Sequence, residues 1–405
     1  GWHLRKENII YVGIDLHKET HTAVMLDCWN TKLGEITFGN KPSEFPKLVR
    51  KASRFLTEDK TAVYGLENAY GYGRALAVWL IEKGFHVKDV NTALSYAQRK
   101  SVPMYQKSDS YDAEAVALVL INMLDKLPDA IPDDKYWTLS QLVNRRDNIC
   151  THLRRLKNQL HEQLCTVYPS YKQFFSDISR ATALYFFKEY PSPGHLLGKT
   201  AEELAKELRP VSHNNCSVKR AEKILNLVKS DGETRRKHQE SRDAITRSLV
   251  SDLEHYRIQL EEVNEAIETL LPEFNCTLTT MPGIDVITAA NMLSEIGEIT
   301  RFPSADKLAK FAGIAPVNFS SAGKGKDMCP KQGNRRLQAI FYFMAIQMIQ
   351  VSTNGTPRNK VFREYYLKRV ADGKNKQQAL ICVSRRLVNI VYGMLKNHTE
   401  YREPE

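Results

Sequence analysis

Four carboxylates stand where short predicted elements end or begin. Asp15 closes the apolar run NIIYVGIDL, and Glu67 closes TAVYGLE in the same way. Asp109 and Asp112 lie three residues apart at the start of a predicted helix in KSDSYDAEAVALVL, so both belong to one helical face. A carboxylate at the end of a buried strand costs free energy unless a cation or hydrogen bonds compensate for it. Together the four acids could hold two Mg²⁺ ions about 4 Å apart, an arrangement that assists phosphoryl transfer.

Each acid also has an ordinary structural explanation. Asp109 would serve as a helix N-cap, and Asp112 would lie in the first turn, where the helix dipole favours acids. Asp15 would be a turn aspartate after its strand. His17 could act as an acid or base, but we expect a surface histidine and leave it out of the catalytic set. The metal site is favoured because it accounts for all four acids together.

A second chemical candidate is the segment GIAPVNFSSAGKGK, which pairs two serines with two lysines. The P-loop signature G-x-x-x-x-G-K-[ST] is absent here. One hydroxyl, of Ser320 or Ser321, could attack phosphorus if a base or metal activated it and nearby cations stabilised the developing charge. Simple contact with a nucleic-acid backbone is the alternative role for most of these cations. The basic residues of the segment and of the following PKQGNRRL are Lys324, Lys326, Lys331, Arg335 and Arg336.

The elements that must position the acids lie in residues 8–130. Three short strand patterns, NIIYVGIDL, HTAVMLD and GEITFGN, come first, and helix and strand patterns alternate after them. A meander of three strands followed by alternating helix and strand predicts an α/β domain with a mixed sheet.

Residues 131–272 are long, polar and helical. Leu249, Leu253, Tyr256, Leu260, Val263, Ile267 and Leu270 follow steps of four and three, the pattern of a coiled coil. Either an antiparallel hairpin within one chain or an interface between two chains would satisfy this pattern. We therefore expect a helical coiled-coil or assembly region between the α/β domain and the rest.

Residues 273–400 form a compact, mostly helical third domain. Its start, MPGIDVITAANML, is similar to a helix-hairpin-helix in which Gly283 makes the tight turn and the next helix offers backbone N–H groups to a phosphate. An ordinary corner between two helices explains the pattern about as well.

Charge and composition favour a nucleic-acid partner. The chain carries a formal net charge of +11, which favours a polyanion. From Glu273 to the end, 19 Lys and Arg face 11 Asp and Glu, so the last third holds an excess of eight positive charges. The seven cysteines show no zinc spacing and predict free thiols in a reducing cytoplasm. No apolar run reaches the roughly 18 residues of a membrane helix.

Several motifs resemble one known family. YVGIDLHKETHTAVMLD, YGLENAYGYGRALAVWL and KSDSYDAEAVALVL resemble the RuvC-like half of the Asp-Glu-Asp-Asp (DEDD) transposases of bacterial insertion sequences. These Piv/MooV-related enzymes are also called bridge-RNA-guided recombinases. MPGIDVITAANMLSEIGEITRF, LAKFAGIAPVNFSSAGKGK and KQGNRRLQAIFY resemble the family's C-terminal domain.

The resemblance implies a function and roles for particular residues. Asp15, Glu67, Asp109 and Asp112 match the four acids of the family, which hold Mg²⁺. Ser321 matches the nucleophile that forms a covalent phosphoserine link to DNA, although Ala322 stands where a glycine usually follows. The implied partners are donor and target DNA, a structured bridge RNA and further copies of the chain, as a dimer or a tetramer, in a bacterial cytoplasm.

Two other functions fit the same residues. A RuvC-type junction nuclease would use water as its nucleophile and would need the acids but not Ser321. An inactive relative would only bind nucleic acid and would tolerate loss of the acids.

Overall fold

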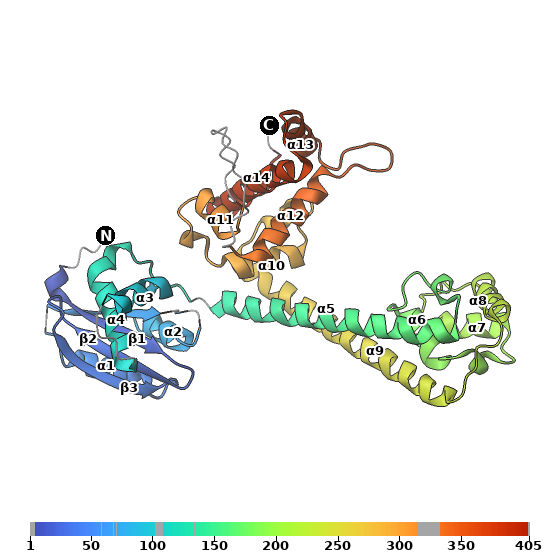
Figure 1. Cartoon of the computed structure of the whole chain (residues 1–405), viewed down its shortest axis with the longest axis horizontal. Helices are drawn as coiled ribbons and strands as arrows, with labels where there is room; N and C mark the ends of the chain where they lie inside the picture. Colours follow the sequence, from blue (N-terminus) through green and yellow to red (C-terminus); the bar gives the residue numbers. More distant parts are fainter. Residues whose placement is uncertain are drawn as a thin grey trace. The chain divides into compact units, whose positions relative to one another are not determined.

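The computed structural model describes residues 5–57, 59–67, 69, 71–101, 108–132, 134–314 and 333–403. The chain divides into two compact units, and we describe each by itself. One unit comprises residues 1–138 and 295–335, and the other comprises residues 139–294 and 336–405. Figure 1 shows the whole chain coloured along the sequence.

A five-stranded mixed sheet forms the centre of the first unit. Its order is β3-β2-β1-β4-β5, with β1 antiparallel to β2, β2 antiparallel to β3, and β4 parallel to both β1 and β5. The predicted three-strand meander and the mixed sheet are thereby confirmed. The strands are β1 (Ile9–Leu16), β2 (Thr20–Leu26), β3 (Lys32–Gly39), β4 (Thr61–Glu67) and β5 (His86–Val90).

Helices cover both faces of this sheet (Figure 1). Even-numbered residues of β1 and β4, such as Ile14 and Leu66, pack with side chains of α1 (Phe45–Ser53) and α2 (Arg74–Glu82). Odd-numbered residues, such as Tyr11 and Val63, pack with side chains of α4 (Asp109–Met123). Alternate residues of a strand face opposite sides, so Asp15 and Glu67 belong to the side that α4 covers.

Two glycines let α4 approach the sheet closely. A Cβ added at Gly13 would lie 2.2 Å from the Ala113 carbonyl oxygen and 2.3 Å from the Ala117 nitrogen. A Cβ at Gly65 would lie 2.7 Å from the Leu120 side chain. Because both strands lack a side chain at these positions, the helix lies directly on the backbone, and its start comes beside the end of β1.

Two long helices dominate the second unit: α5 (Asp134–Val167) and α9 (Gln239–Leu270). Arg146 Nε donates to Asn264 Oδ1 at 2.8 Å, and the rings of His152 and Tyr256 stack with centroids 5.4 Å apart. The predicted helices exist, whereas a continuous coiled-coil seam stays a prediction. Leu153 and Leu156 in the middle of α5 are only half-buried, and Ile258 on α9 is 57% exposed.

Shorter helices gather at one end of the long pair (Figure 1). Phe174, Phe186 and Phe187 form an aromatic core there, together with Leu253 of α9. Residues between the two long helices therefore fold as separate short helices. These helices are α6 (Ala181–Glu189), α7 (Ala201–Leu208) and α8 (Val218–Asp231).

Apart from one helix that follows β5, the remaining helices lie in the last third of the chain, as the sequence predicts. None of the helices within the described ranges is both long and apolar enough to cross a membrane. The other helices are α3 (Thr92–Lys100), α10 (Val286–Ile296), α11 (Ala305–Phe311), α12 (Arg335–Ile349), α13 (Lys360–Ala371) and α14 (Lys376–Asn397).

Candidate functional site

The two strand acids are brought together at one edge of the sheet. Strands β1 and β4 run parallel, and their register pairs Ile14 with Leu66. The next residues are Asp15 and Glu67, so the two acids end neighbouring strands on the α4 side. Carboxyl ends of parallel strands are a common place for ligand sites in open α/β sheets.

The helix acids come from the first turn of α4. Ser108 caps this helix, because its Oγ accepts from the Tyr111 N–H at 3.1 Å. Asp109 is therefore the first helical residue and not the cap, which removes one ordinary explanation for it. Asp109 and Asp112 both stand in the turn where the helix dipole stabilises negative charge.

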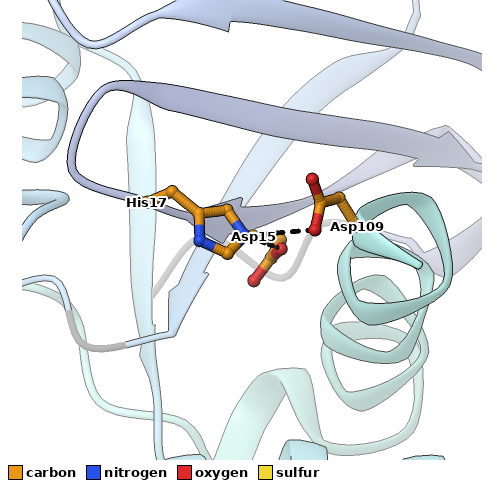
Figure 2. A group of neighbouring side chains, drawn as sticks. All are labelled: Asp15, His17 and Asp109. Carbon is orange, nitrogen blue, oxygen red and sulfur yellow. Dashed lines mark hydrogen bonds and ion pairs between the residues drawn. The ribbon is translucent and has the colours of Figure 1, made fainter. Parts of the chain in front are cut away.

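Asp15, Asp109 and His17 form the outer cluster of the site. His17 Nε2 lies 2.8 Å from Asp15 Oδ2 and 3.2 Å from Asp109 Oδ1, so the imidazole bridges a strand acid and a helix acid. In Figure 2, dashed lines join the His17 ring to the carboxylates of Asp15 and Asp109. One ligand atom from each residue lies within 4.8 Å of the others, a spacing at which they could hold a metal ion.

Burial and charge act in opposite directions on this cluster. Burial raises the pKa of Asp15, the His17 imidazole opposes that rise, and the negative charges of Asp112 and Asp109 add to it. Burial lowers the pKa of His17, but the Asp15 and Asp109 carboxylates outweigh it and raise the pKa overall. The acids therefore form one electrostatic site that favours a bound cation.

Glu67, Asp112 and Arg99 form the inner cluster. Arg99 NH1, from the last turn of α3, lies 3.4 Å from Glu67 Oε2 and 3.7 Å from Asp112 Oδ1. Ser95, fully buried one turn earlier on α3, donates its Oγ–H to Glu67 Oε2 at 2.8 Å. The guanidinium thus bridges the second pair of acids as the imidazole bridges the first.

The donor set suits a divalent metal ion. Carboxylate oxygens are the ligands that Mg²⁺ prefers, and an imidazole nitrogen suits transition metals. Asp112 Oδ1 is a buried oxygen without a hydrogen-bond partner within the described ranges. Such an atom costs free energy unless a cation compensates for it, so the residues fit a metal ion as well as they fit the two basic side chains.

The sequence itself matches proteins of insertion elements. Residues 12–169 match the transposase family model of IS110-type DEDD enzymes, and residues 275–367 match the model described as the IS116/IS110/IS902 transposase family. The chain is therefore similar, in two separate regions, to transposases of the IS110/IS116 family. The two matched regions hold all four acids in the first and the serine segment in the second.

Two relatives from insertion elements match most of the length of this chain. It is 26% identical over 405 residues to the uncharacterized 44.8 kDa protein of insertion element IS116 from Streptomyces clavuligerus, covering 96% of this chain and 95% of that protein. It is 26% identical over 324 residues to the uncharacterized 43.6 kDa protein of IS110 from Streptomyces coelicolor, covering 75% of each. A pilin gene-inverting protein of Moraxella bovis is 26% identical over 175 residues, covering 41% of this chain and 52% of that protein.

Residues 315–332, which hold most of the serine segment, separate two described parts of the chain. Ser320, Ser321, Lys324, Lys326 and Lys331 lie outside the described residues.

The flanking residues meet at one point. The Asn334 N–H donates to the Phe311 carbonyl at 2.7 Å, and its Nδ2 donates to Glu295 Oε2 at 2.6 Å. A Cβ at Gly333 would lie 2.6 Å from the Gly313 Cα. Gly313 and Gly333 therefore lie next to each other.

The other predicted contacts to nucleic acid have different settings. Gly283 has φ +91, as a tight turn requires. However, the Asp285 carboxylate accepts from the Thr288 N–H at 2.7 Å at the start of α10, and this negative charge opposes a phosphate there. Arg335 is exposed on the first turn of α12.

Arg336 is already engaged by the long helix α5. It donates to Asn144 Oδ1 at 2.9 Å and pairs with the Asp147 carboxylate. Its setting therefore favours an anchor between α12 and α5 over a contact to nucleic acid.

Three basic or polar residues of the site were not among the predicted site residues. His17 is exposed, as expected, but its ring also contacts Asp15 and Asp109, two residues that the sequence did place in the site. Ser95 and Arg99 were not singled out at all. Their spacing of four residues, on a helix that follows the edge strand β5, is the one signal that both face the same way.

Proposed function

We propose that this chain cuts and rejoins DNA strands during transposition, using divalent metal ions held by Asp15, Glu67, Asp109 and Asp112. The observation that carries the proposal is the convergence of the four acids at the carboxyl edge of β1 and β4. Mg²⁺ bound there would neutralise charge on the scissile phosphate and lower the pKa of a coordinated oxygen. The acids would hold the metal ions through which the phosphate is oriented, and the buried Ser95 would keep Glu67 in position.

In this proposal Ser321 is the nucleophile. Its Oγ forms a bond to phosphorus, the bond from phosphorus to the leaving DNA oxygen breaks, and that oxygen takes up a proton while the serine loses one. The phosphodiester energy is kept in the phosphoserine link. A hydroxyl of another strand can then attack the same phosphorus and release the serine, so rejoining needs no energy-supplying cofactor.

Support for the serine comes from its setting in the sequence. Ser321 lies between flanks that meet at Gly313 and Gly333, and Lys324 and Lys326 follow it within five residues. The lysines would stabilise the additional negative charge of the transition state.

The partners we propose are donor and target DNA, a structured bridge RNA and further copies of the chain. The excess of positive charge in the last third of the chain supports the proposal that nucleic acids are partners. The sequence motifs that resemble those of the bridge-RNA-guided recombinases support the proposal of a bridge RNA as a partner. Two duplexes must be held together for strand exchange, which supports an assembly of at least two chains.

A denaturing gel for protein attached to labelled DNA tests this function. The chain would be expressed with the flanking non-coding sequence of its element and given Mg²⁺ and DNA spanning the end of that element. We expect an adduct that persists in Ser320→Ala and disappears in Ser321→Ala and in Asp15→Ala. Cleaved DNA without any adduct would overturn the serine step in favour of a nuclease that uses water.

A further inference from the structure

A basic cavity lies in the second unit, and its lining includes no residue of the proposed cleavage site. Its volume is about 630 Å³, and its walls come from the 3₁₀ turn Tyr171–Gln173 with the residues just after it and from the first two turns of α8. The cavity contains no carboxylate in its lining and four cationic side chains: Lys172, Lys219, Arg220 and Lys223.

Most of this positive charge is not neutralised by the protein. The side chains of Lys172, Lys219 and Lys223 are exposed, and no carboxylate of the described residues pairs with them. Lys219 and Lys223 are four residues apart, so they project from the same side of α8. The neighbouring Asp177 is already engaged by Lys157 Nζ at 3.0 Å, and its charge therefore does not cancel theirs.

Arg220 is held in place before any ligand arrives. Its guanidinium lies over the Phe175 ring, 5.6 Å from the centroid, and NH2 donates to the Phe174 carbonyl at 3.4 Å. Both phenylalanines belong to the buried aromatic core of this region. An arginine fixed on a rigid core loses less conformational freedom when it binds an anion than a freely moving one does.

The start of α8 adds a further preference for negative charge. Ser217 caps this 14-residue helix by accepting from the Arg220 N–H at 3.2 Å, and its first turn contains no acid. The helix dipole therefore points its positive end into the cavity lining. Glu222, which faces a smaller adjoining hollow with Lys219 and Lys223, is the one acid next to this surface along α8.

The composition of the surrounding segment agrees with this local picture. Residues 168–238, which connect the two long helices, contain 13 Lys and Arg against 8 Asp and Glu. The excess of five positive charges lies far in sequence from the serine segment and its lysines.

We propose that this cavity binds the phosphodiester backbone of a nucleic-acid strand. The segment between α5 and α9 would then be a second nucleic-acid contact of the transposase, in a region for which the sequence indicated only assembly. Exposed lysines, a fixed arginine and a helix start recognise phosphates of DNA and RNA alike, and they read no base sequence. The contact does not depend on strand cleavage.

The test is a binding experiment on the full chain without divalent metal, so that no DNA is cut. Fluorescence anisotropy would measure affinity for labelled duplex DNA and for labelled single-stranded RNA at several salt concentrations between 50 and 300 mM. One variant carries Lys172→Gln, Lys219→Gln and Lys223→Gln. A matched control carries Lys206→Gln, Lys229→Gln and Lys237→Gln, which removes equal charge from exposed positions of the same segment outside the cavity.

For at least one nucleic acid we expect the cavity variant to reduce the slope of log K against log salt by about two to three, since each phosphate contact contributes about 0.7 to 0.9. The control should keep the parent slope. If the slope of the cavity variant falls with RNA alone or with DNA alone, that nucleic acid is the one that the cavity binds. Equal slopes for parent, control and cavity variant with both nucleic acids would overturn the proposal.

Amide hydrogen exchange locates the effect on the chain. In the parent complex, we expect slower exchange in peptides covering residues 172–176 and 217–224 than in the free protein. Unchanged exchange in both peptides, with binding otherwise intact, would place the contact elsewhere and would also overturn the proposal. This result is independent of the adduct assay, so the two proposals can fail separately.

Discussion

Arg99 offers the sharpest test of how the acids are held without metal. Arg99→Met removes the guanidinium and keeps an unbranched apolar chain in its place. At an effective dielectric constant of about 20, each contact, at 3.4 Å to Glu67 and 3.7 Å to Asp112, is worth roughly 4–5 kcal/mol before desolvation is subtracted. The three side chains are 14% to 17% exposed. They therefore lie between surface pairs, worth up to about 1 kcal/mol, and buried pairs, whose disruption costs about 3–5 kcal/mol. We expect a net loss of about 2 kcal/mol.

Hydrogen exchange measured on the full chain reports this loss locally, without requiring the whole protein to unfold in one step. Without divalent metal, a loss of about 2 kcal/mol predicts roughly 30-fold faster exchange of protected amides in β4, α3 and the start of α4. Arg50→Met is the control, because Arg50 is exposed on α1 and its side chain has no ion pair within the described ranges.

Mg²⁺ should reduce the difference in amide exchange rate between Arg99→Met and the parent. Removing the competing guanidinium should tighten metal binding about 10-fold, for example from about 1 mM to about 0.1 mM. At 10 mM Mg²⁺ the parent would then gain about 1.4 kcal/mol and Arg99→Met about 2.7 kcal/mol. The reasoning fails if Arg99→Met exchanges like the parent without metal, or if Mg²⁺ slows exchange equally in Arg99→Met and Arg50→Met.

Three further predictions concern single positions. Gly13→Ala places a methyl group against the backbone of α4 and should cost at least about 2 kcal/mol, seen as a lower thermal midpoint and weaker Mg²⁺ stabilisation. Burial would raise the pKa of Asp177, but hydrogen bonds from Ser179 and the Lys157 ion pair lower it to about 2. Because the pKa of this carboxyl is lower in the folded than in the unfolded state, the ionised group stabilises the fold above about pH 4. This stabilisation is lost as the pH falls toward 2. The side chain is partly exposed, which reduces the expected effect. Asp177→Asn should lower the free energy of unfolding by about 1 kcal/mol at pH 7 and leave it unchanged at pH 2, as measured by urea titrations at both pH values. Arg336→Met leaves Asp147 without its partner and should speed exchange in α12 about tenfold while leaving the salt dependence of DNA binding unchanged.

The sequence could predict the four acids as a group because their positions follow from simple periodicity. A strand that ends in an acid puts it at a sheet edge, and acids three apart on a helix share a face. The register between β1 and β4 and the glycines under α4 then convert these local facts into proximity. The sheet itself was predictable for the same reason, since its strands are short apolar runs separated by turn residues.

The basic partners could not be predicted in the same way. Whether Arg99 reaches Glu67 depends on how α3 is rotated about its axis beside β5, and packing against α4 decides this rotation. His17 lies beyond the paired part of β1, so periodicity alone did not show that its ring would turn back toward Asp15. The heptad pattern of α9 correctly marked a long helix, but it contained no information on which parts of its face would stay exposed.

The pairing of acids with bases bears on how any substitution at this site should be interpreted. Each basic side chain is shared between one strand acid and one helix acid, His17 by Asp15 and Asp109, and Arg99 by Glu67 and Asp112. Alanine at one acid therefore removes a candidate metal ligand and at the same time leaves a base with a single partner. An Asp→Asn change keeps the size and hydrogen-bonding capacity of the side chain while it removes the charge. If both substitutions at Asp109 abolish strand cleavage but only alanine speeds amide exchange in α4, the loss of activity follows from the missing charge and not from a displaced helix.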